Sequence, residues 1–264
     1  MKRPFLFFIC LTIISIIICY TLSIPYYSAA EPFKPFHISP QKDDTIRISI
    51  IGDSWALLHT LHNCKIDSII KKSINRNAQS YSKGISGLTS KEIYESIFYK
   101  DSIRSLIERG PQYCVVFAGI NDTDLKMGKY FFRNNMKLII DFLINNDVTP
   151  IIIEIPHYNI KYSYERRYKR QKLLRLISMI VTGSEMDCID SYNKTLYDLI
   201  SDHYQRSTIY IRNEDWNPKG YQDPRNIYTS DLMHITEIGY NILDSCIATF
   251  IINNNRNFLL RHKH

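Results

Sequence analysis

Ser54 is the first candidate for chemistry in this sequence, because it lies where an apolar strand pattern gives way to a helical one. It stands in the run Ile50-Ile51-Gly52-Asp53-Ser54-Trp55, after a β-branched segment that begins at Thr45. Gly52 permits the sharp turn that a residue with a Cβ resists. A serine on such a turn projects its hydroxyl clear of the sheet, where it can attack a carbonyl carbon if a base takes its proton.

His234 and Asp231 are the residues that can supply this base. They belong to the run Asp231-Leu232-Met233-His234, which precedes a helical pattern near the end of the chain. An imidazole can accept the proton of the serine, and a carboxylate can hold the other ring N–H and stabilise the imidazolium. Together with Ser54, this pair predicts nucleophilic attack on an acyl group.

Two further polar loops follow predicted strands. One is Gly84-Ile85-Ser86-Gly87-Leu88-Thr89-Ser90, and the other is Gly119-Ile120-Asn121-Asp122 after the apolar run 113–118. All four segments would lie at the carboxyl ends of strands, which is the edge where parallel sheets bind ligands. In this order they resemble the SGNH (GDSL-like) hydrolase family, over about residues 45–252.

The resemblance implies an oxyanion hole for the charge that develops on the attacked carbonyl oxygen. Its donors would be the backbone N–H groups of Ser54 and Gly87 and the side-chain amide of Asn121. We choose Gly87 because the glycine of the family usually precedes a small residue and then Thr, at a junction between loop and helix. Gly84 remains an alternative.

Each segment also has a simpler interpretation. Gly-Asp-Ser could be an ordinary turn at the end of a strand, and Asn121 could cap a helix or accept a glycan within Asn121-Asp122-Thr123. Asp231 and His234 could be half of a metal site. No third ligand cluster is evident, so we expect neither a metal nor a cofactor.

Four other residues are candidates for contacting a substrate. Aromatic rings in the loop 213–225 could stack on sugars, although a simple surface loop is an open alternative. A histidine that follows a predicted strand could line the cleft or have a structural role. The candidates are Trp55, His157, Trp216 and Tyr221.

The segments that must position these residues alternate between strand and helix patterns. This alternation predicts an α/β fold, a three-layer sandwich with a mostly parallel central sheet. The family resemblance implies the same SGNH, flavodoxin-like arrangement. Among the predicted elements are helices at 89–109, 129–146 and 236–252, a buried strand at 148–155 and a short strand at 187–190.

The start of the chain differs from the rest. The stretch from Phe5 to Ile24 has no charged side chain and is long enough to cross a bilayer, and Lys2 and Arg3 precede it. We therefore expect residues 1–24 to be an uncleaved membrane anchor, with the main domain on the exported side, periplasmic or extracellular. Small residues before Glu31 leave open a signal peptide that is cleaved there, which would release a secreted protein.

Two regions follow this segment. Residues 25–44 include four prolines among polar and aromatic residues and are expected to form a semi-extended tether that holds the domain off the membrane. Residues 45–264 are expected to form the SGNH hydrolase-like domain.

The charge of the chain is basic and partly concentrated. The formal net charge is +7, and seven Lys or Arg residues lie between Lys161 and Arg175 with three tyrosines among them. A solvated helix face is the simplest interpretation. The functional alternatives are contact with anionic lipid or with an acidic polysaccharide. We expect no nucleic-acid partner because the domain is predicted to be exported.

Three functions are compatible with these observations. The leading hypothesis is an exported serine esterase that removes acyl groups, with acetyl as the first candidate, from a carbohydrate or another cell-envelope substrate. The second is a polysaccharide O-acyltransferase that uses the same three residues beside a membrane O-acyltransferase. The third is a non-catalytic glycan-binding module. All four segments carry the residues that the chemistry needs, which favours the two catalytic hypotheses.

Overall fold

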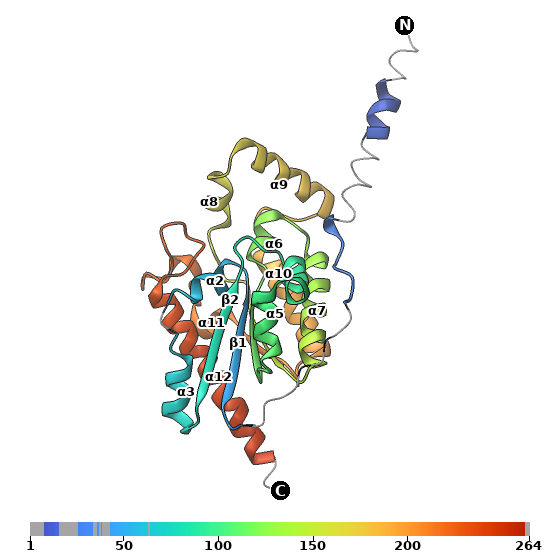
Figure 1. Ribbon diagram of the computed structural model, residues 1–264. Helices are drawn as coiled ribbons and strands as arrows, with labels where there is room; N and C mark the ends of the chain where they lie inside the picture. The colour runs from blue at the N-terminus through green and yellow to red at the C-terminus, as the bar shows by residue number, and fades with distance from the viewer. Residues whose placement is uncertain are drawn as a thin grey trace.

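The computed structural model describes residues 8–15, 26–33, 36, 38, 43–62 and 64–261. In this part of the chain, a parallel sheet of five strands in the order β2-β1-β3-β4-β5 carries helices on both of its faces (Figure 1). The predicted α/β fold with a parallel central sheet is therefore confirmed. The strands are β1 (Ile46–Gly52), β2 (Ala78–Gly84), β3 (Tyr113–Phe117), β4 (Thr149–Ile153) and β5 (Ile209–Ile211).

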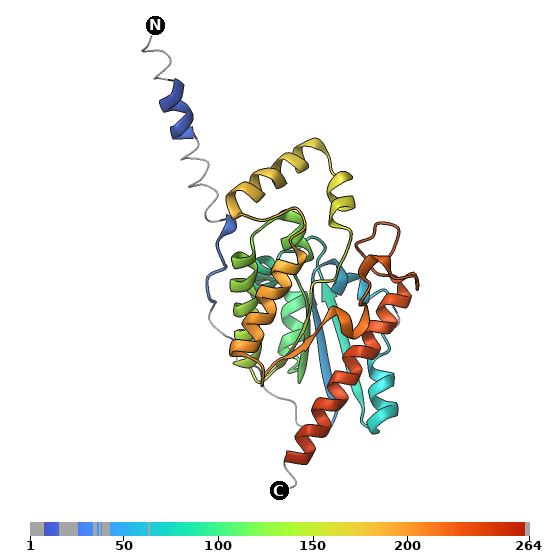
Figure 2. The same ribbon diagram turned by 180° about the vertical axis from the view of Figure 1, so that it is seen from behind.

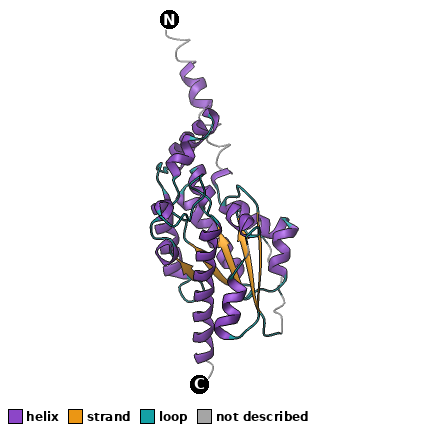
Figure 3. Ribbon diagram, turned by 90° about the vertical axis from the view of Figure 1, so that its left-hand side faces the viewer, coloured by secondary structure: helices purple, strands orange, loops and turns teal. Residues whose placement is uncertain are grey.

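The helices form two layers around this sheet. Figure 1 shows α3 and α12 on one side and α5, α7 and α10 on the other, and Figure 3 shows α12 crossing in front of the strands. Every residue of β3 is buried, as expected for a strand that is covered on both faces. The helices are α2 (Ser54–His59), α3 (Ile66–Ile74), α4 (Ser90–Tyr99), α5 (Asp101–Glu108), α6 (Ile120–Leu125), α7 (Lys129–Ile144), α8 (Ile160–Glu165), α9 (Lys169–Thr182), α10 (Ile189–His203), α11 (Asn213–Trp216), the 3₁₀ helix η1 (Gly220–Gln222) and α12 (Glu237–Arg261).

The strand order places a switch point between β1 and β3. From β1 the chain continues to β2 on one side, and it returns to pair β3 with β1 on the other side. The connections that leave β1 and β3 therefore diverge at the carboxyl edge of the sheet, the edge where such folds bind ligands. Ser54 begins α2 after β1 and Asn121 is the second residue of α6 after β3, so both residues lie at this edge.

Two predicted elements are wrong in detail. The segment 187–190, predicted to be a short strand, instead leads into α10, which begins at Ile189, because its apolar residues continue at helical spacing and are buried through Leu196. The fifth strand is β5, which has only three residues and gives too short a pattern to predict. The helix predicted at 89–109 is divided into α4 and α5 by Lys100, whose backbone is extended.

The predicted anchor lies mostly outside the described residues. Of residues 1–24 the structure describes 8–15, which are helical. No helix in the described part of the chain is long and apolar enough to cross a membrane. The anchor therefore stays a prediction.

Several described residues of the segment 25–44, which is predicted to be a semi-extended tether, pack against the domain. Ala30 and Ile38 are buried, and the Ala30 N–H donates to Asn135 Oδ1 at 2.8 Å. The ring of Phe33 contacts those of Tyr94 and Phe98 on α4. Burial of these apolar side chains stabilises their contact with the domain.

Candidate active site

Ser54 is the first residue of α2, directly after the turn that ends β1. Gly52 has φ +151°, and a Cβ on it would lie 2.1 Å from the carbonyl oxygen of Phe117 on β3. Only glycine allows this approach, which confirms the requirement for glycine before the turn. Because Ser54 lies in the first turn of a helix, its own N–H has no acceptor within that helix.

The structure brings Ser54, His234 and Asp231 together in one chain of hydrogen bonds. The Nε2 atom of His234 lies 2.9 Å from Ser54 Oγ, and its Nδ1 atom lies 2.6 Å from Asp231 Oδ2. A proton on Nδ1 is then held by the carboxylate, which leaves Nε2 free to accept the serine proton. Such an arrangement can generate a serine nucleophile.

The turn that carries Asp231 fixes this carboxylate firmly. Its Oδ1 atom accepts hydrogen bonds from the Thr229 hydroxyl at 2.6 Å and from the backbone N–H groups of Met233 and His234 at 2.9 Å each. Partial burial alone would raise the pKa of Asp231, but the hydrogen bonds from Thr229 and His234 outweigh burial and hold that pKa well below its usual range. The carboxyl group is therefore ionised at neutral pH.

The Asn121 amide connects the loops that carry the other predicted oxyanion donors. Its Nδ2 atom donates to the Leu88 carbonyl at 3.0 Å and to Asp53 Oδ2 at 3.3 Å. Leu88 follows Gly87, and Asp53 precedes Ser54. The Asn121 amide thus lies between the loops that carry Ser54 and Gly87, and both of its N–H groups donate to protein acceptors.

The structure also separates the two candidate glycines. A Cβ on Gly84 would lie 2.2 Å from the Asp53 carbonyl oxygen and 2.4 Å from Leu57 N, so Gly84 is needed where β2 packs against α2. Gly87 has φ +84° and open space around its Cβ position. Among the described residues, no acceptor lies against the Gly87 N–H. These observations favour Gly87 over Gly84 as a donor to a ligand.

Two buried carboxyl groups support the same loops, and sequence reasoning missed them. Asp53 accepts from the Trp55 N–H at 2.9 Å as well as from Asn121, and burial raises its pKa to about 7. Asp122 accepts from the N–H and the hydroxyl of Ser90 at 2.9 and 2.5 Å, and burial raises its pKa to about 6. Their positions in the sequence could have indicated this role, since Asp53 precedes Ser54 and Asp122 follows Asn121.

A cavity of about 290 Å³ opens beside His234. Arg166 and Arg167, which follow α8, form part of its wall together with Ser163. The sequence shows the basic stretch but does not indicate that it lies beside His234. The cavity is lined by Ser163, Arg166, Arg167, Asp231, Met233 and His234.

Trp55 and Trp216 do not have the predicted substrate-binding role. Both indoles are buried, and their ring centroids lie 6.1 Å apart in an edge-to-face pair. Their large apolar area stabilises the core between α2 and α11, so neither ring offers a face to a sugar.

His157 and Tyr221 remain candidates for contacting a substrate. Both side chains are partly exposed, and the Tyr221 N–H donates to the His157 carbonyl at 2.9 Å. His157 Nε2 lies 3.6 Å from the Asp190 carboxylate. Neither residue lines the cavity beside His234.

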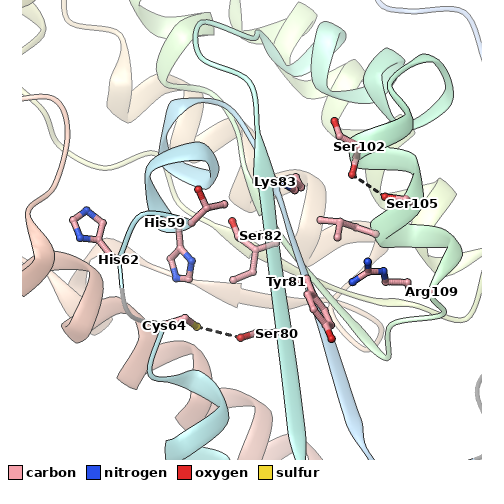
Figure 4. Close-up of a pocket in the computed structure, with 13 residues that line it drawn as sticks. His59, His62, Cys64, Ser80, Tyr81, Ser82, Lys83, Ser102, Ser105 and Arg109 are labelled. Atoms are coloured by element: carbon pink, nitrogen blue, oxygen red, sulfur yellow. Dashed lines mark hydrogen bonds between the residues drawn. The ribbon is translucent and has the colours of Figure 1, made fainter.

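Within the described residues, one group of side chains has the composition of a metal site. His59, Cys64 and Asp244 offer ligand atoms within 4.8 Å of one another, and His59 and Cys64 line a second cavity of about 400 Å³ (Figure 4). These atoms take part in hydrogen bonds within the protein. His59 Nε2 lies 2.7 Å from Asp244 Oδ1, and the Lys65 N–H donates to Asp244 Oδ2. Burial raises the pKa of the Cys64 thiol to about 12, and its sulfur lies 3.2 Å from the Ser80 hydroxyl oxygen. The group is best described as a buried pair that joins α2 to α12.

Comparison with known proteins identifies the fold. No protein-family model matches the chain, and neither does any curated protein. Solved structures do match, including a GDSL-like lipase from Bacteroides thetaiotaomicron with 15% identity and a TM-score of 0.52, over 89% of this chain and 98% of that one. The chain therefore has the fold of GDSL-like lipases and acylhydrolases over most of its length, as the sequence resemblance predicted.

Two further matches are esterases. A family 3 carbohydrate esterase from Clostridium thermocellum has 15% identity and a TM-score of 0.56, over 81% of this chain and 98% of that one. An acetyl xylan esterase has 16% identity and a TM-score of 0.52, over 77% of this chain and 98% of that one. At these identities the likeness concerns the fold.

Proposed function

We propose that this protein is a serine esterase that removes an acyl group through an acyl-Ser54 intermediate. The observation that carries the proposal is the hydrogen-bonded chain from Ser54 Oγ through His234 to Asp231. The fold supports this proposal, because a GDSL-like lipase, a carbohydrate esterase and an acetyl xylan esterase have a similar fold.

In the proposed first half-reaction, Ser54 Oγ attacks the ester carbonyl carbon while His234 Nε2 takes the hydroxyl proton. The negative charge moves to the carbonyl oxygen, where the N–H groups of Ser54 and Gly87 would stabilise it. The Asn121 amide would join them by exchanging its 3.3 Å hydrogen bond to Asp53 for one to this oxygen. The C–O bond to the alcohol then breaks, and the alcohol leaves with the proton from His234. Asp231 stabilises the imidazolium during this step.

The second half-reaction repeats these steps with water. His234 takes a proton from a water molecule, whose oxygen attacks the acyl carbon and breaks its bond to Ser54. The proton then returns to Ser54 Oγ, and the carboxylic acid leaves. Over both half-reactions one ester and one water give one alcohol and one carboxylic acid, and Ser54 and His234 return to their starting states.

We propose an acylated glycan, and an acetylated one first, as the substrate. Support comes from the carbohydrate esterase and the acetyl xylan esterase among the proteins of similar fold. Arg166 and Arg167 in the cavity wall favour a glycan that carries carboxylate or phosphate groups. We further propose that residues 1–24 anchor the protein, with the domain on the exported side of the membrane, because of the uncharged stretch behind Lys2 and Arg3.

Transfer of the acyl group to a sugar hydroxyl is the second candidate function. The cavity beside His234 favours it, because an acceptor held there would lie next to the base that must deprotonate it. The two functions differ only in whether water or the acceptor attacks the acyl-enzyme. Mass spectrometry of acetate and acetylated oligosaccharide, with Ser54→Ala as control, distinguishes them.

Hydrolysis of a small activated acetate ester is the test of the proposed function. Ser54→Ala is expected to abolish turnover while the unfolding transition stays near that of the wild type, because the hydroxyl contributes little packing. Ser96→Ala is a matched control, since this buried serine hydroxyl donates to the Ile93 carbonyl within α4 and has no proposed part in the reaction. Near-wild-type activity of Ser54→Ala would refute the proposal.

A further inference from the structure

Helix α9 has its polar face turned toward the protein. Residues 171, 175, 178 and 182 share this face, as their helical spacing requires. The Arg175 guanidinium donates to the Asp124 carbonyl at 3.0 Å and pairs with its carboxylate, and the Thr182 hydroxyl donates to the Lys126 carbonyl at 3.0 Å. A surface helix of a globular domain ordinarily turns its apolar stripe inward, so α9 is inverted.

The outward side of α9 is apolar. Ile180 is 83% exposed, and large side chains accompany it along the last ten residues of the helix. Contiguous apolar surface of this kind usually marks a contact with a membrane or another macromolecule. The exposed apolar residues are Leu173, Leu174, Leu176, Ile177, Ile180 and Val181.

Cationic side chains flank this apolar surface and indicate what it contacts. Lys169 and Arg170 are exposed in the first turn, and Lys172 follows them. No Asp or Glu occurs between Glu165 and Glu185. Tyr168, which is 82% exposed, caps the helix. Leucine and isoleucine on one face with Lys and Arg beside them are typical of helices that lie in the surface of an anionic bilayer.

The N-terminal segment enters the domain at the same helix. The Tyr27 hydroxyl lies 2.6 Å from Ser178 Oγ on α9, and the predicted anchor ends three residues earlier, at Ile24. Figures 1 and 2 both show helix 8–15 and α9 at the same end of the molecule. With 14 residues, α9 is about 21 Å long, which is too short to span a bilayer but sufficient to lie along one.

We propose that α9 lies in the surface of an anionic lipid bilayer and holds the cavity beside His234 at the membrane. α9 is joined directly to this cavity, because Arg166 and Arg167, which connect α8 to α9, form part of the cavity wall. The inference rests on the proposed membrane location of the chain. It does not require hydrolysis, so its test is separate from the test of Ser54.

Quenching of tryptophan by brominated lipid tests this proposal. The full chain carrying Ile180→Trp is placed in vesicles of phosphatidylethanolamine and phosphatidylglycerol, with and without brominated phosphatidylcholine. The native residues Trp55 and Trp216 are buried and supply the same background in every variant. The control is Lys72→Trp on α3, an exposed position far from α9 in Figure 1.

The expected result is loss of fluorescence from Ile180→Trp that is about twofold greater than from Lys72→Trp, because an interfacial helix places its apolar face within reach of the acyl chains. Replacing phosphatidylglycerol by neutral lipid, or changing Lys169, Arg170 and Lys172 to Gln, should reduce this quenching. Equal quenching at the two positions would overturn the proposal. Protection of Ile180→Trp from aqueous acrylamide without lipid quenching would also overturn it, in favour of a second copy or a protein partner.

Discussion

The side-chain amide of Asn121 is held by the buried carboxyl group of Asp53, with 3.3 Å between Nδ2 and Oδ2. Asp53 is the residue before Ser54, so one carboxyl group connects the predicted oxyanion donor to the predicted nucleophile. Asn121 also bonds the Leu88 carbonyl, which fixes the loop of Gly87. These contacts connect the loops that carry Ser54, Gly87 and Asn121 to one another.

Asn121→Ala is expected to lower kcat by about 10²–10³ and to change KM little, because the amide would act mainly on charge that appears in the transition state. Steady-state kinetics with an activated acetate ester measures both constants. Asn146→Ala is a matched control, since that amide bonds the Phe142 carbonyl at the end of α7. Lost stability with unchanged kcat per folded molecule would show that Asn121 is only structural.

Asp53 should make stability depend on pH in a particular direction. Burial raises the pKa of its carboxyl group in the folded protein to about 7, from an ordinary value of 3.8. Between about pH 4 and pH 7 the folded state therefore binds more protons than the unfolded state, and this group makes the protein less stable as the pH rises.

Asp53→Asn should remove this dependence. Relative to the wild type, the free energy of unfolding of the variant should rise by about 1–3 kcal/mol between pH 4.5 and pH 7.5. Urea unfolding at several pH values measures the difference. A constant difference over this range would show that the carboxyl group does not titrate there.

Arg166→Gln should weaken the binding of acidic substrates. Its side chain lies in the cavity wall beside His234, so KM for an ester that carries a carboxylate should rise by about three- to tenfold, and less at high salt. The control is Lys161→Gln on α8, which removes an exposed charge that does not line the cavity. An equal rise for a neutral acetate ester would indicate a general structural effect.

Local sequence signals were sufficient for the residues that form the hydrogen-bonded chain. The turn at Ser54 follows a continuous apolar strand, and Asp231 and His234 lie three residues apart. Each signal reports the chemistry of one short segment. The sheet places Ser54 at its carboxyl edge directly after β1, whereas Asp231 and His234 reach the same edge on a loop that follows α11 and η1.

Features that depend on tertiary contacts could not be predicted in this way. The tryptophans at 55 and 216 looked available for stacking on sugars, but each is buried against the other. The basic stretch 161–175 predicted a solvated, charged helix face. In the structure Arg175 of α9 pairs with Asp124, so the polar side of α9 faces the protein and its apolar side faces outward. β5 has only three residues, so its place in the sheet depends on pairing with β4.

Covalent trapping of the nucleophile tests the central claim most directly. The full-length protein is treated with a fluorophosphonate, and the modified residue is located by peptide mass spectrometry. We predict a single stoichiometric adduct on Ser54, which is lost in Ser54→Ala and formed far more slowly in His234→Ala, because the hydroxyl depends on the imidazole as base. An adduct on another residue, or unchanged labelling of Ser54→Ala, would contradict the assignment of Ser54 as the nucleophile.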